Sequence, residues 1–271
     1  MLQDQTLAFI GAGQMADAMI GGLLRRELLA PNQVIATAPR EERRRQLEHG
    51  WHVRATDDNQ AAAAVADIVI FSVKPQTLPK VLPQVRPAIR PETLVISIVA
   101  GAPIHRFAEA LDHPAIVRSM PNTPAQIGEG ITVWTATREV TAKQRERARL
   151  ILGALGDEIF VEEEHYLDMA TALSGTGPAY FFLLMEALID AGVHMGFPRW
   201  IAERLVMQTM LGSVRYALRS GKHPAELRNA VTSPGGTSAA ALYEAERGGL
   251  RTVLADAVWA AYRRSVDLGG K

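Results

Sequence analysis

The sequence predicts an α/β protein in which a doubly wound sheet comes first and an all-α domain follows. Three observations carry this prediction: a glycine-rich turn directly after the first apolar run, apolar runs that alternate with helical patterns, and the end of that alternation near residue 162. Strands that alternate with helices are typical of a parallel sheet covered on both faces. We therefore expect two domains, residues 1–162 and residues 163–271.

The first strand is expected at Thr6–Ile10, and a GxGxxA motif follows it without a gap. Gly11 permits a tight turn, Gly13 lets the backbone approach a pyrophosphate, and Ala16 allows the helix to pack closely on the strand. This pattern predicts a Rossmann-type dinucleotide site. The expected cofactor contacts are Gly11, Ala12, Gly13, Gln14 and Met15. Tight turns in other α/β proteins produce the same motif by packing alone.

The second strand, expected at Gln33–Thr37, indicates the cofactor. An NAD enzyme usually has an acidic residue here for the ribose 2′-hydroxyl, and this sequence has none. The Thr37 hydroxyl and the Arg40 cation would suit a 2′-phosphate, which favours NADPH, with NADH as an additional possibility. Arg40 is alternatively the first exposed residue of the next helix, and we expect Glu41–Arg45 to form a solvated face of that helix.

Later strands are expected wherever apolar runs recur. The helix between the last two expected strands begins with a capping-box pattern, Thr141–Gln144. The expected runs are Asp67–Val73, Thr93–Ala100, Ala115–Ser119, Gly130–Ala136 and Glu158–Val161.

Beyond these runs the pattern is helical. Pro178, Pro198 and Pro224 each stand where a helix is expected to begin, and two more helices are expected over Ser238–Arg247 and Leu250–Leu268. The helix at Tyr180–Met195 is apolar around most of its circumference, so it must be buried on nearly all sides. A homodimer interface is the most economical explanation, and burial inside the helical domain is the alternative.

Composition narrows the class of partner. The chain of 271 residues has 29 basic and 29 acidic side chains, so it lacks the net positive charge that would attract nucleic acid or an anionic membrane. It has no cysteine, and the seven histidines and the segment Glu162–His165 lack metal-ligand spacing. We expect no metal, no nucleic acid, no membrane-spanning run and a cytoplasmic location.

Four further motifs occur in a fixed order along nearly the whole chain: Ser72–Pro75, Met120–Pro124, Ala172–Tyr180 and Leu227–Ser238. Together with the glycine-rich start, they resemble the pyrroline-5-carboxylate reductase family. That resemblance implies a Rossmann domain, an all-helical dimerisation domain, an active site between subunits and often a ring of dimers. It also implies hydride transfer from NAD(P)H to 1-pyrroline-5-carboxylate, which gives L-proline in the last step of proline synthesis.

The loop Ser233–Ser238 is the candidate substrate site. It leads into a helical pattern, where backbone N–H groups converge and favour a carboxylate. Its expected substrate contacts are Ser233, Gly235, Gly236, Thr237 and Ser238. By the resemblance, Ser238 occupies the position of a family threonine whose hydroxyl lies beside the imine nitrogen, which makes it a catalytic candidate. The alternative is an ordinary turn before a helix.

Other candidates would surround the cofactor. Lys74 suits a cofactor hydrogen bond or long-range charge compensation, and is our second catalytic candidate; alternatively, Lys74 and Pro75 form only a helix-start turn. Asn59 matches a family position near the adenosine, although capping would also explain it. Asn122 could contact the nicotinamide, and turn chemistry is the alternative. For Ser174–Gly177 we favour a structural role as a tight helix junction. The remaining expected cofactor contacts are Ser72, Val73 and Pro75.

Three other functions remain open. β-Hydroxyacid dehydrogenases place a catalytic lysine in the long helix after the Rossmann domain, and Thr176–Met195 contains none. A reductase of another cyclic imine would carry the same motifs. A catalytically inactive NAD(P)-sensing protein would keep the fold without the reaction, and the intact Ser233–Ser238 loop argues against it.

Overall fold

A computed structural model describes residues 2–270 and contains one eight-stranded sheet with the order β3-β2-β1-β4-β5-β6-β7-β8. The first six strands are parallel and have the doubly wound order that crosses over between β1 and β4. The strands are β1 (Leu7–Ile10), β2 (Val34–Thr37), β3 (Arg54–Thr56), β4 (Ile68–Phe71), β5 (Leu94–Ser97), β6 (Ile116–Met120), β7 (Gly130–Ala136) and β8 (Gly156–Phe160).

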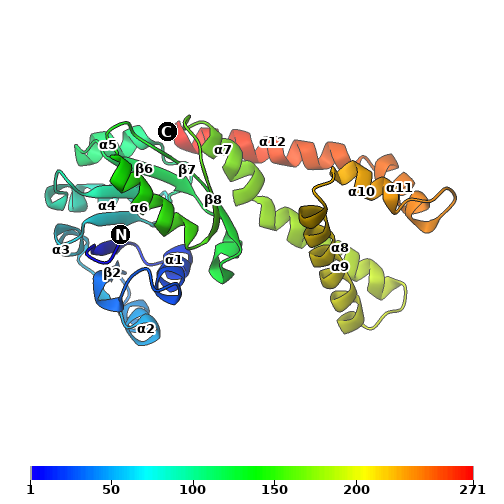
Figure 1. Cartoon of the computed structure of the whole chain (residues 1–271), viewed down its shortest axis with the longest axis horizontal. Helices are drawn as coiled ribbons and strands as arrows, with labels where there is room; N and C mark the ends of the chain where they lie inside the picture. The colour runs from blue at the N-terminus through cyan, green and yellow to red at the C-terminus, as the bar shows by residue number, and fades with distance from the viewer. Residues whose placement is uncertain (1, 271) are drawn as a thin grey trace. The chain divides into compact units, whose positions relative to one another are not determined.

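Helices cover both faces of this sheet (Figure 1). They are α1 (Gln14–Arg25), α2 (Glu41–Trp51), α3 (Asn59–Ala64), α4 (Leu78–Val85), α5 (Ile104–Leu111) and α6 (Ala142–Gly153). Short 3₁₀ turns lie at Pro31–Gln33, Arg86–Ala88 and Thr123–Ile127. The capping box predicted at α6 is confirmed, because the backbone N–H of Thr141 and the N–H of Gln144 each donate to the other's side chain.

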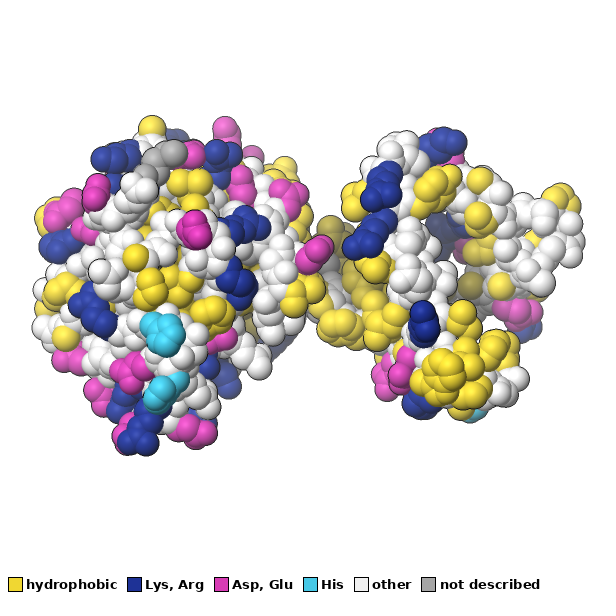
Figure 2. All heavy atoms as spheres, turned by 60° about the horizontal axis from the view of Figure 1, so that its bottom comes forward, with side chains coloured by type: hydrophobic (Ala, Val, Ile, Leu, Met, Phe, Trp, Pro, Cys, Tyr) yellow, Lys and Arg dark blue, Asp and Glu magenta, His cyan; other side chains and the backbone are white. Residues whose placement is uncertain are grey.

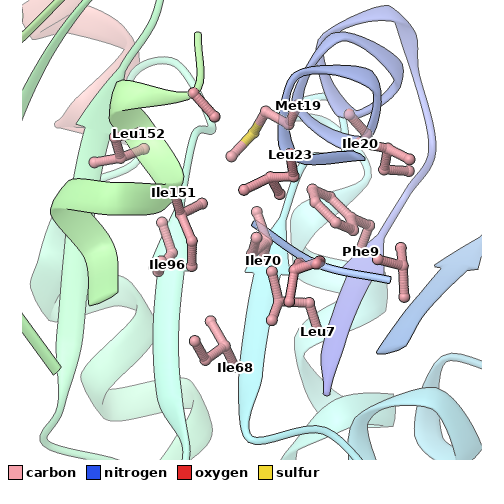
Figure 3. Close-up of a cluster of buried hydrophobic side chains, with 14 of the residues drawn as sticks. Leu7, Phe9, Met19, Ile20, Leu23, Ile68, Ile70, Ile96, Ile151 and Leu152 are labelled. Atoms are coloured by element: carbon pink, nitrogen blue, oxygen red, sulfur yellow. The ribbon is translucent and has the colours of Figure 1, made fainter. Parts of the chain in front are cut away.

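The core on one face lies between β1, β4 and β5 below and α1 and α6 above (Figure 3). Phe9 of β1 and Ile70 of β4 point toward Met19 and Leu23 of α1, and all four side chains are fully buried. A second buried cluster on the opposite face joins the sheet to α3, α4 and α5. β1 and β4 are buried on both faces, so all their residues are apolar. Their continuous apolar runs made both strands predictable from the sequence.

Two features of the sheet differ from the expectation. The strand β3 was not predicted, because it is a three-residue edge strand, Arg54–Thr56, without a buried side chain. β7 runs antiparallel to β6, so the sheet is mixed rather than parallel throughout. The connection between β6 and β7 covers only residues 121–129, and a parallel pair would need a crossover of about a dozen residues or more.

The chain folds as two compact units, and the second contains residues 179–260. The first unit holds the sheet, everything up to Pro178, and the end of the last helix from Ala261 onward. Helices after the sheet are α7 (Tyr166–Ala170), a π turn (Thr171–Gly175), α8 (Gly177–His194), α9 (Arg199–Ser220), α10 (Pro224–Ala230), α11 (Thr237–Arg247) and α12 (Leu250–Gly269). The predicted boundary at residue 162 stays a prediction.

A buried ionic cluster attaches two of these helices to the sheet. The Arg118 side chain in β6 is only 5% exposed, and its guanidinium pairs with Glu164 at 2.8 Å and with Asp168 at 3.2 Å. Asp168 in α7 also accepts a hydrogen bond from Ser265 in α12. Glu164 accepts the backbone N–H of Ile104 at the start of α5. One arginine therefore joins β6, α5, α7 and α12.

The helical unit exposes much of its apolar surface (Figure 2). Phe181, Phe182 and Leu183 of α8 are each more than half exposed, and the other large exposed side chains include Trp200, Met207 and Trp259. One helical stretch, Tyr166–His194, is long and apolar enough to cross a membrane by length and composition alone. The expectation of no membrane-spanning run stays a prediction.

Candidate cofactor and substrate sites

The glycine-rich loop connects β1 to α1 at the carboxyl edge of the sheet. Gly11 has a φ of +92°, and a Cβ there would lie 2.5 Å from the Val73 side chain, so only glycine fits without strain. At Gly13 a Cβ would meet no atom within 4 Å. Gly13 therefore borders open space, and within residues 2–270 the N–H groups of Gln14, Met15 and Ala16 have no acceptor.

Thr37 shapes this loop from the end of β2. Its hydroxyl accepts the N–H of Gly11 at 2.9 Å and donates to Asn59 Oδ1 at 2.6 Å, while its carbonyl accepts the N–H of Ala12. The residue is 2% exposed. Thr37 therefore positions the glycine-rich loop. Its hydroxyl is already used by Gly11 and Asn59, so these contacts do not support direct binding of a 2′-phosphate.

Asn59 belongs to the same chain of hydrogen bonds. Its side-chain amide donates to Gln84, and Asn59 itself is the first residue of α3. The cap of α3 is Asp58, which accepts the N–H of Ala61. Asn59 therefore does not cap the helix, and its proposed place beside the adenosine stays a prediction.

The motif after β4 lies directly behind the glycine-rich loop. The Ser72 hydroxyl donates to the carbonyl of Gly11, and Val73 packs against that glycine. Lys74 is exposed, and its carbonyl accepts the N–H of Thr77 in the turn that precedes α4; Pro75 is half-buried. The structure thus brings Ser72 and Val73 to the loop and leaves the Lys74 side chain at the surface.

Asn122 follows β6 at the same carboxyl edge. Its side-chain oxygen accepts the N–H of Ile131 at 2.9 Å, which fixes the turn between β6 and β7. Asn122 also begins the short helical turn Thr123–Ile127. The turn chemistry is therefore present, and the nicotinamide contact stays a prediction.

A cleft of about 510 Å³ opens beside the glycine-rich loop. Four of the expected cofactor contacts, Ala12, Gly13, Gln14 and Arg40, line it. The other lining residues are Asp17, Ala18, Arg25, Arg43, Gln46, Trp51 and Gln126. Arg40 is exposed at the start of α2.

The segment Glu41–Arg45 is not a uniformly solvated face, so that expectation is corrected. Arg43 is half-buried and donates to the Ala12 carbonyl, and Arg44 donates to the carbonyls of Ala38 and Pro39. The sequence offered one signal that Arg43 lies at the cleft: it is three residues after Arg40, so both arginines lie at the start of α2.

The substrate loop precedes α11 in the helical unit. Gly235 has a φ of +72°, and the N–H of Gly236 donates to the Ser233 carbonyl at 3.0 Å. The next three N–H groups, those of Thr237, Ser238 and Ala239, have no acceptor in the part of the chain that the structure describes. Such an end of an 11-residue helix favours a carboxylate through both hydrogen bonds and the helix dipole.

The segment Ser174–Gly177 forms a junction between helices, in agreement with the structural role we favoured. Ser174 and Thr176 donate their hydroxyls to the carbonyls of Ala170 and Thr171 across the π turn. A Cβ at Gly175 would lie 2.7 Å from the end of the Met120 side chain. The small residue therefore lets the π turn pack closely on the end of β6.

His113 lies outside these sites, just before β6. Burial lowers the pKa of His113, and a contact of 2.7 Å between its Nε2 and the Thr93 carbonyl partly opposes that shift. His113 lies at the edge of the sheet where β5 and β6 begin, whereas the candidate site residues follow the ends of strands at the opposite edge. His113 is therefore a buried core residue away from these sites.

A doubly wound sheet with a glycine-rich turn, followed by helices of which one begins with unpaired N–H groups in the described chain, is typical of a nicotinamide-dependent oxidoreductase. Residues 164–268 match the family model described as pyrroline-5-carboxylate reductase dimerisation, and residues 6–101 match that of NADP oxidoreductase, coenzyme F420-dependent. The pyrroline-5-carboxylate reductase of Synechocystis is 42% identical over 98% of both chains, and that of Pseudomonas aeruginosa is 42% identical over 97% of this chain and 96% of its own.

Solved structures agree. The NADP-bound pyrroline carboxylate reductase of Plasmodium falciparum has a TM-score of 0.91 at 31% identity and covers 98% of this chain and 99% of its own. The pyrroline-5-carboxylate reductase of Coxiella burnetii has a TM-score of 0.89 at 35% identity, covering 97% and 98%. The chain belongs to the pyrroline-5-carboxylate reductase family. The predicted fold class and the predicted dimerisation domain are confirmed.

We expect the two loop glycines to respond differently to alanine. Gly11→Ala combines a positive φ with a clash on Val73, so it should lower the free energy of unfolding by about 1 to 2 kcal/mol and weaken NADPH binding. Gly13→Ala should weaken NADPH binding at least about tenfold without a loss of stability, because its methyl enters only the open side of the loop. Urea unfolding and fluorescence titration with NADPH measure the two effects. Equal stability losses in both variants would contradict the assignment of Gly11 to the turn and of Gly13 to close approach of the cofactor.

Proposed function

We propose that the chain reduces 1-pyrroline-5-carboxylate to L-proline with NADPH, and that the residues described above divide this task between cofactor and substrate. Membership of the reductase family assigns the reaction. The single observation that best supports activity rather than mere nucleotide sensing is the set of three unpaired N–H groups at the start of α11. A nucleotide sensor has no need of a second anion site.

The first unit would hold the cofactor. NADPH supplies the hydride when it is bound. The fit is good, because Gly13 borders open space, and the free N–H groups of Gln14 and Met15 face the position that a pyrophosphate needs. Thr37, Ser72 and Val73 support the glycine-rich loop from behind.

The loop Ser233–Ser238 would hold the substrate. The N–H groups of Thr237 and Ser238 bind its carboxylate, and Gly235 and Gly236 leave room for it. The Ser238 hydroxyl then orients the imine nitrogen. An iminium that arrives protonated needs no general acid from the chain, so most of the rate comes from orientation.

Three side chains would complete the cofactor site. Lys74 is exposed beyond the end of β4, where it compensates negative charge on the cofactor or substrate. The Asn122 side-chain oxygen is used by Ile131, so its NH₂ group is the part that would contact the nicotinamide. Asn59 would lie beside the adenosine.

The assembly extends this proposal. The exposed apolar side chains of the helical unit support a dimer, as the matched dimerisation model indicates, and we propose that dimers assemble further into a ring. The apolar stretch Tyr166–His194 then serves subunit contact instead of a bilayer. The balance of 29 basic and 29 acidic residues supports a cytoplasmic enzyme that binds neither nucleic acid nor membrane. The proposed domains are residues 1–162 and 163–271.

The direct test is oxidation of NADPH, followed by its absorbance, when purified protein is added to 1-pyrroline-5-carboxylate, with NADH in parallel. We expect rapid consumption of NADPH with proline as the product. NADPH binding without turnover would reject the reductase and support a sensing protein. Turnover only with a different cyclic imine would reassign the substrate.

Ser238→Ala tests the orienting hydroxyl. We expect kcat to fall about tenfold to a hundredfold, the range that corresponds to one lost hydrogen bond to a charged group, while NADPH binding is retained. Ser238→Thr is the matched control. It keeps the hydroxyl and introduces the threonine that the family usually carries, so kcat should stay within about twofold of the parent. An Ala variant as active as the parent would remove Ser238 from the site.

A further inference from the structure

Arg43 is a cation at the cofactor cleft that the proposed function leaves unused. It lies one turn after Arg40 on α2, and both arginines line the cleft beside Gly13 and Gln14. Within the described chain Arg40 has no ion-pair partner, and its side chain is exposed. Arg43 is a fixed cation, because its side chain is only 23% exposed.

Two contacts fix the Arg43 guanidinium. Its Nε donates to the Ala12 carbonyl at 2.9 Å, and its Nη2 donates to Asp17 Oδ1 at 2.7 Å. Asp17 is held in turn by the indole N–H of Trp51 at 3.2 Å. The remaining nitrogen, Nη1, has only a long contact of 3.3 Å with the exposed Gln46 side chain. The fork therefore keeps donors for a ligand in the cleft.

We propose that Arg43, oriented by Asp17, is a specificity-determining residue that binds the 2′-phosphate of NADPH together with Arg40. A guanidinium binds phosphate through several planar N–H groups, and one that is already ordered loses little side-chain entropy on binding. Arg40 supplies charge but must be ordered, whereas Arg43 supplies a prepared geometry. Asp17 has two opposing effects: it orients Arg43 and partly cancels its charge.

This inference rests on the proposed NADPH-dependent function, yet it is tested without imine or turnover. The probes are 2′,5′-ADP and 5′-AMP, which differ in the 2′-phosphate, and their dissociation constants are measured by calorimetry on the full-length protein. We expect Arg43→Gln to weaken 2′,5′-ADP about tenfold or more and to change 5′-AMP less than about threefold. The protein could lack reductase activity and still bind 2′,5′-ADP through Arg43, or it could reduce the imine without that contact. The two measurements therefore distinguish failure of this inference from failure of the proposed function.

Arg45→Gln is the matched control. Arg45 lies on the same helix, is exposed, pairs with Glu41 and does not line this cleft, so its loss removes the same charge without the contact. We expect both dissociation constants to stay within about twofold of the parent. Equal weakening of both probes by Arg43→Gln would make Arg43 a support of the glycine-rich loop alone and overturn the proposal, as would no change.

Asp17→Asn gives an independent test in case Arg43→Gln fails to fold. The amide oxygen still accepts from Arg43 and Trp51, but the negative charge is gone. We expect the preference for 2′,5′-ADP over 5′-AMP to rise about threefold or more, because the Arg43 charge is no longer cancelled. A purely structural ion pair would leave that preference unchanged or lower both affinities, and either result would contradict the assignment.

Discussion

Gly236→Val should abolish most turnover of 1-pyrroline-5-carboxylate while NADPH binding stays intact. A Cβ at this position would lie 2.6 Å from the Ser233 hydroxyl and 3.2 Å from the Ser233 carbonyl, so the Ser233 side chain and the turn before α11 must shift. The free N–H groups of Thr237 and Ser238 would then shift. Since a misplacement of about 1 Å can cost a hundredfold in rate, we expect kcat/KM to fall about a hundredfold or more.

The assay compares this variant with Gly50→Val. Gly50 lies on an exposed part of α2, where an added Cβ meets no atom within 4 Å, so the same substitution should leave both turnover and NADPH binding close to those of the parent. Fluorescence titration of each variant with NADPH separates the cofactor unit from the substrate loop. Retained turnover in Gly236→Val would exclude the carboxylate role of the α11 terminus.

The second large effect concerns stability. Arg118→Met would leave the Glu164 and Asp168 carboxylates without their cation in a largely buried place, and breaking a pair of this kind typically costs 3 to 5 kcal/mol. Glu164 is about one-third exposed, so water would relieve part of that cost. We therefore expect the free energy of unfolding to fall by about 3 kcal/mol, measured by urea unfolding at one fixed protein concentration.

Arg45→Met is the stability control. It breaks the exposed pair with Glu41, which should change the free energy of unfolding by no more than about 0.5 kcal/mol. A loss below about 1 kcal/mol in Arg118→Met would mean that the cluster around this arginine is hydrated and contributes little. Comparing the two variants separates burial from the simple loss of a positive charge.

The sequence was most informative where a physical requirement falls on neighbouring residues. Gly11 must turn with a positive φ beside Val73, and the run Leu7–Ile10 must be apolar because it is buried on both faces. The strand β3 has neither property, since it is short, lies at the edge of the sheet and lacks a buried side chain, so periodicity could not reveal it.

Contacts between distant residues could not be foreseen. Thr37 seemed available for a phosphate, but its hydroxyl is used by Gly11 and Asn59. Arg43 seemed solvated, but Ala12 and Asp17 bind it. The two acids that partner Arg118, Glu164 and Asp168, lie 46 and 50 residues further along the chain. In each case the residue type was visible and its partner was not, because partners are set by the tertiary fold.

The return of the last helix to the first unit decides how the end of the chain can be handled. A Cβ at Gly101 would touch Leu268, and Ser265 is 3% exposed, so the end of α12 packs within the nucleotide-binding unit. Residues 179–260 therefore lie, in sequence, between two parts of one compact unit. A carboxyl-terminal truncation or affinity tag consequently acts on the half that is encoded first.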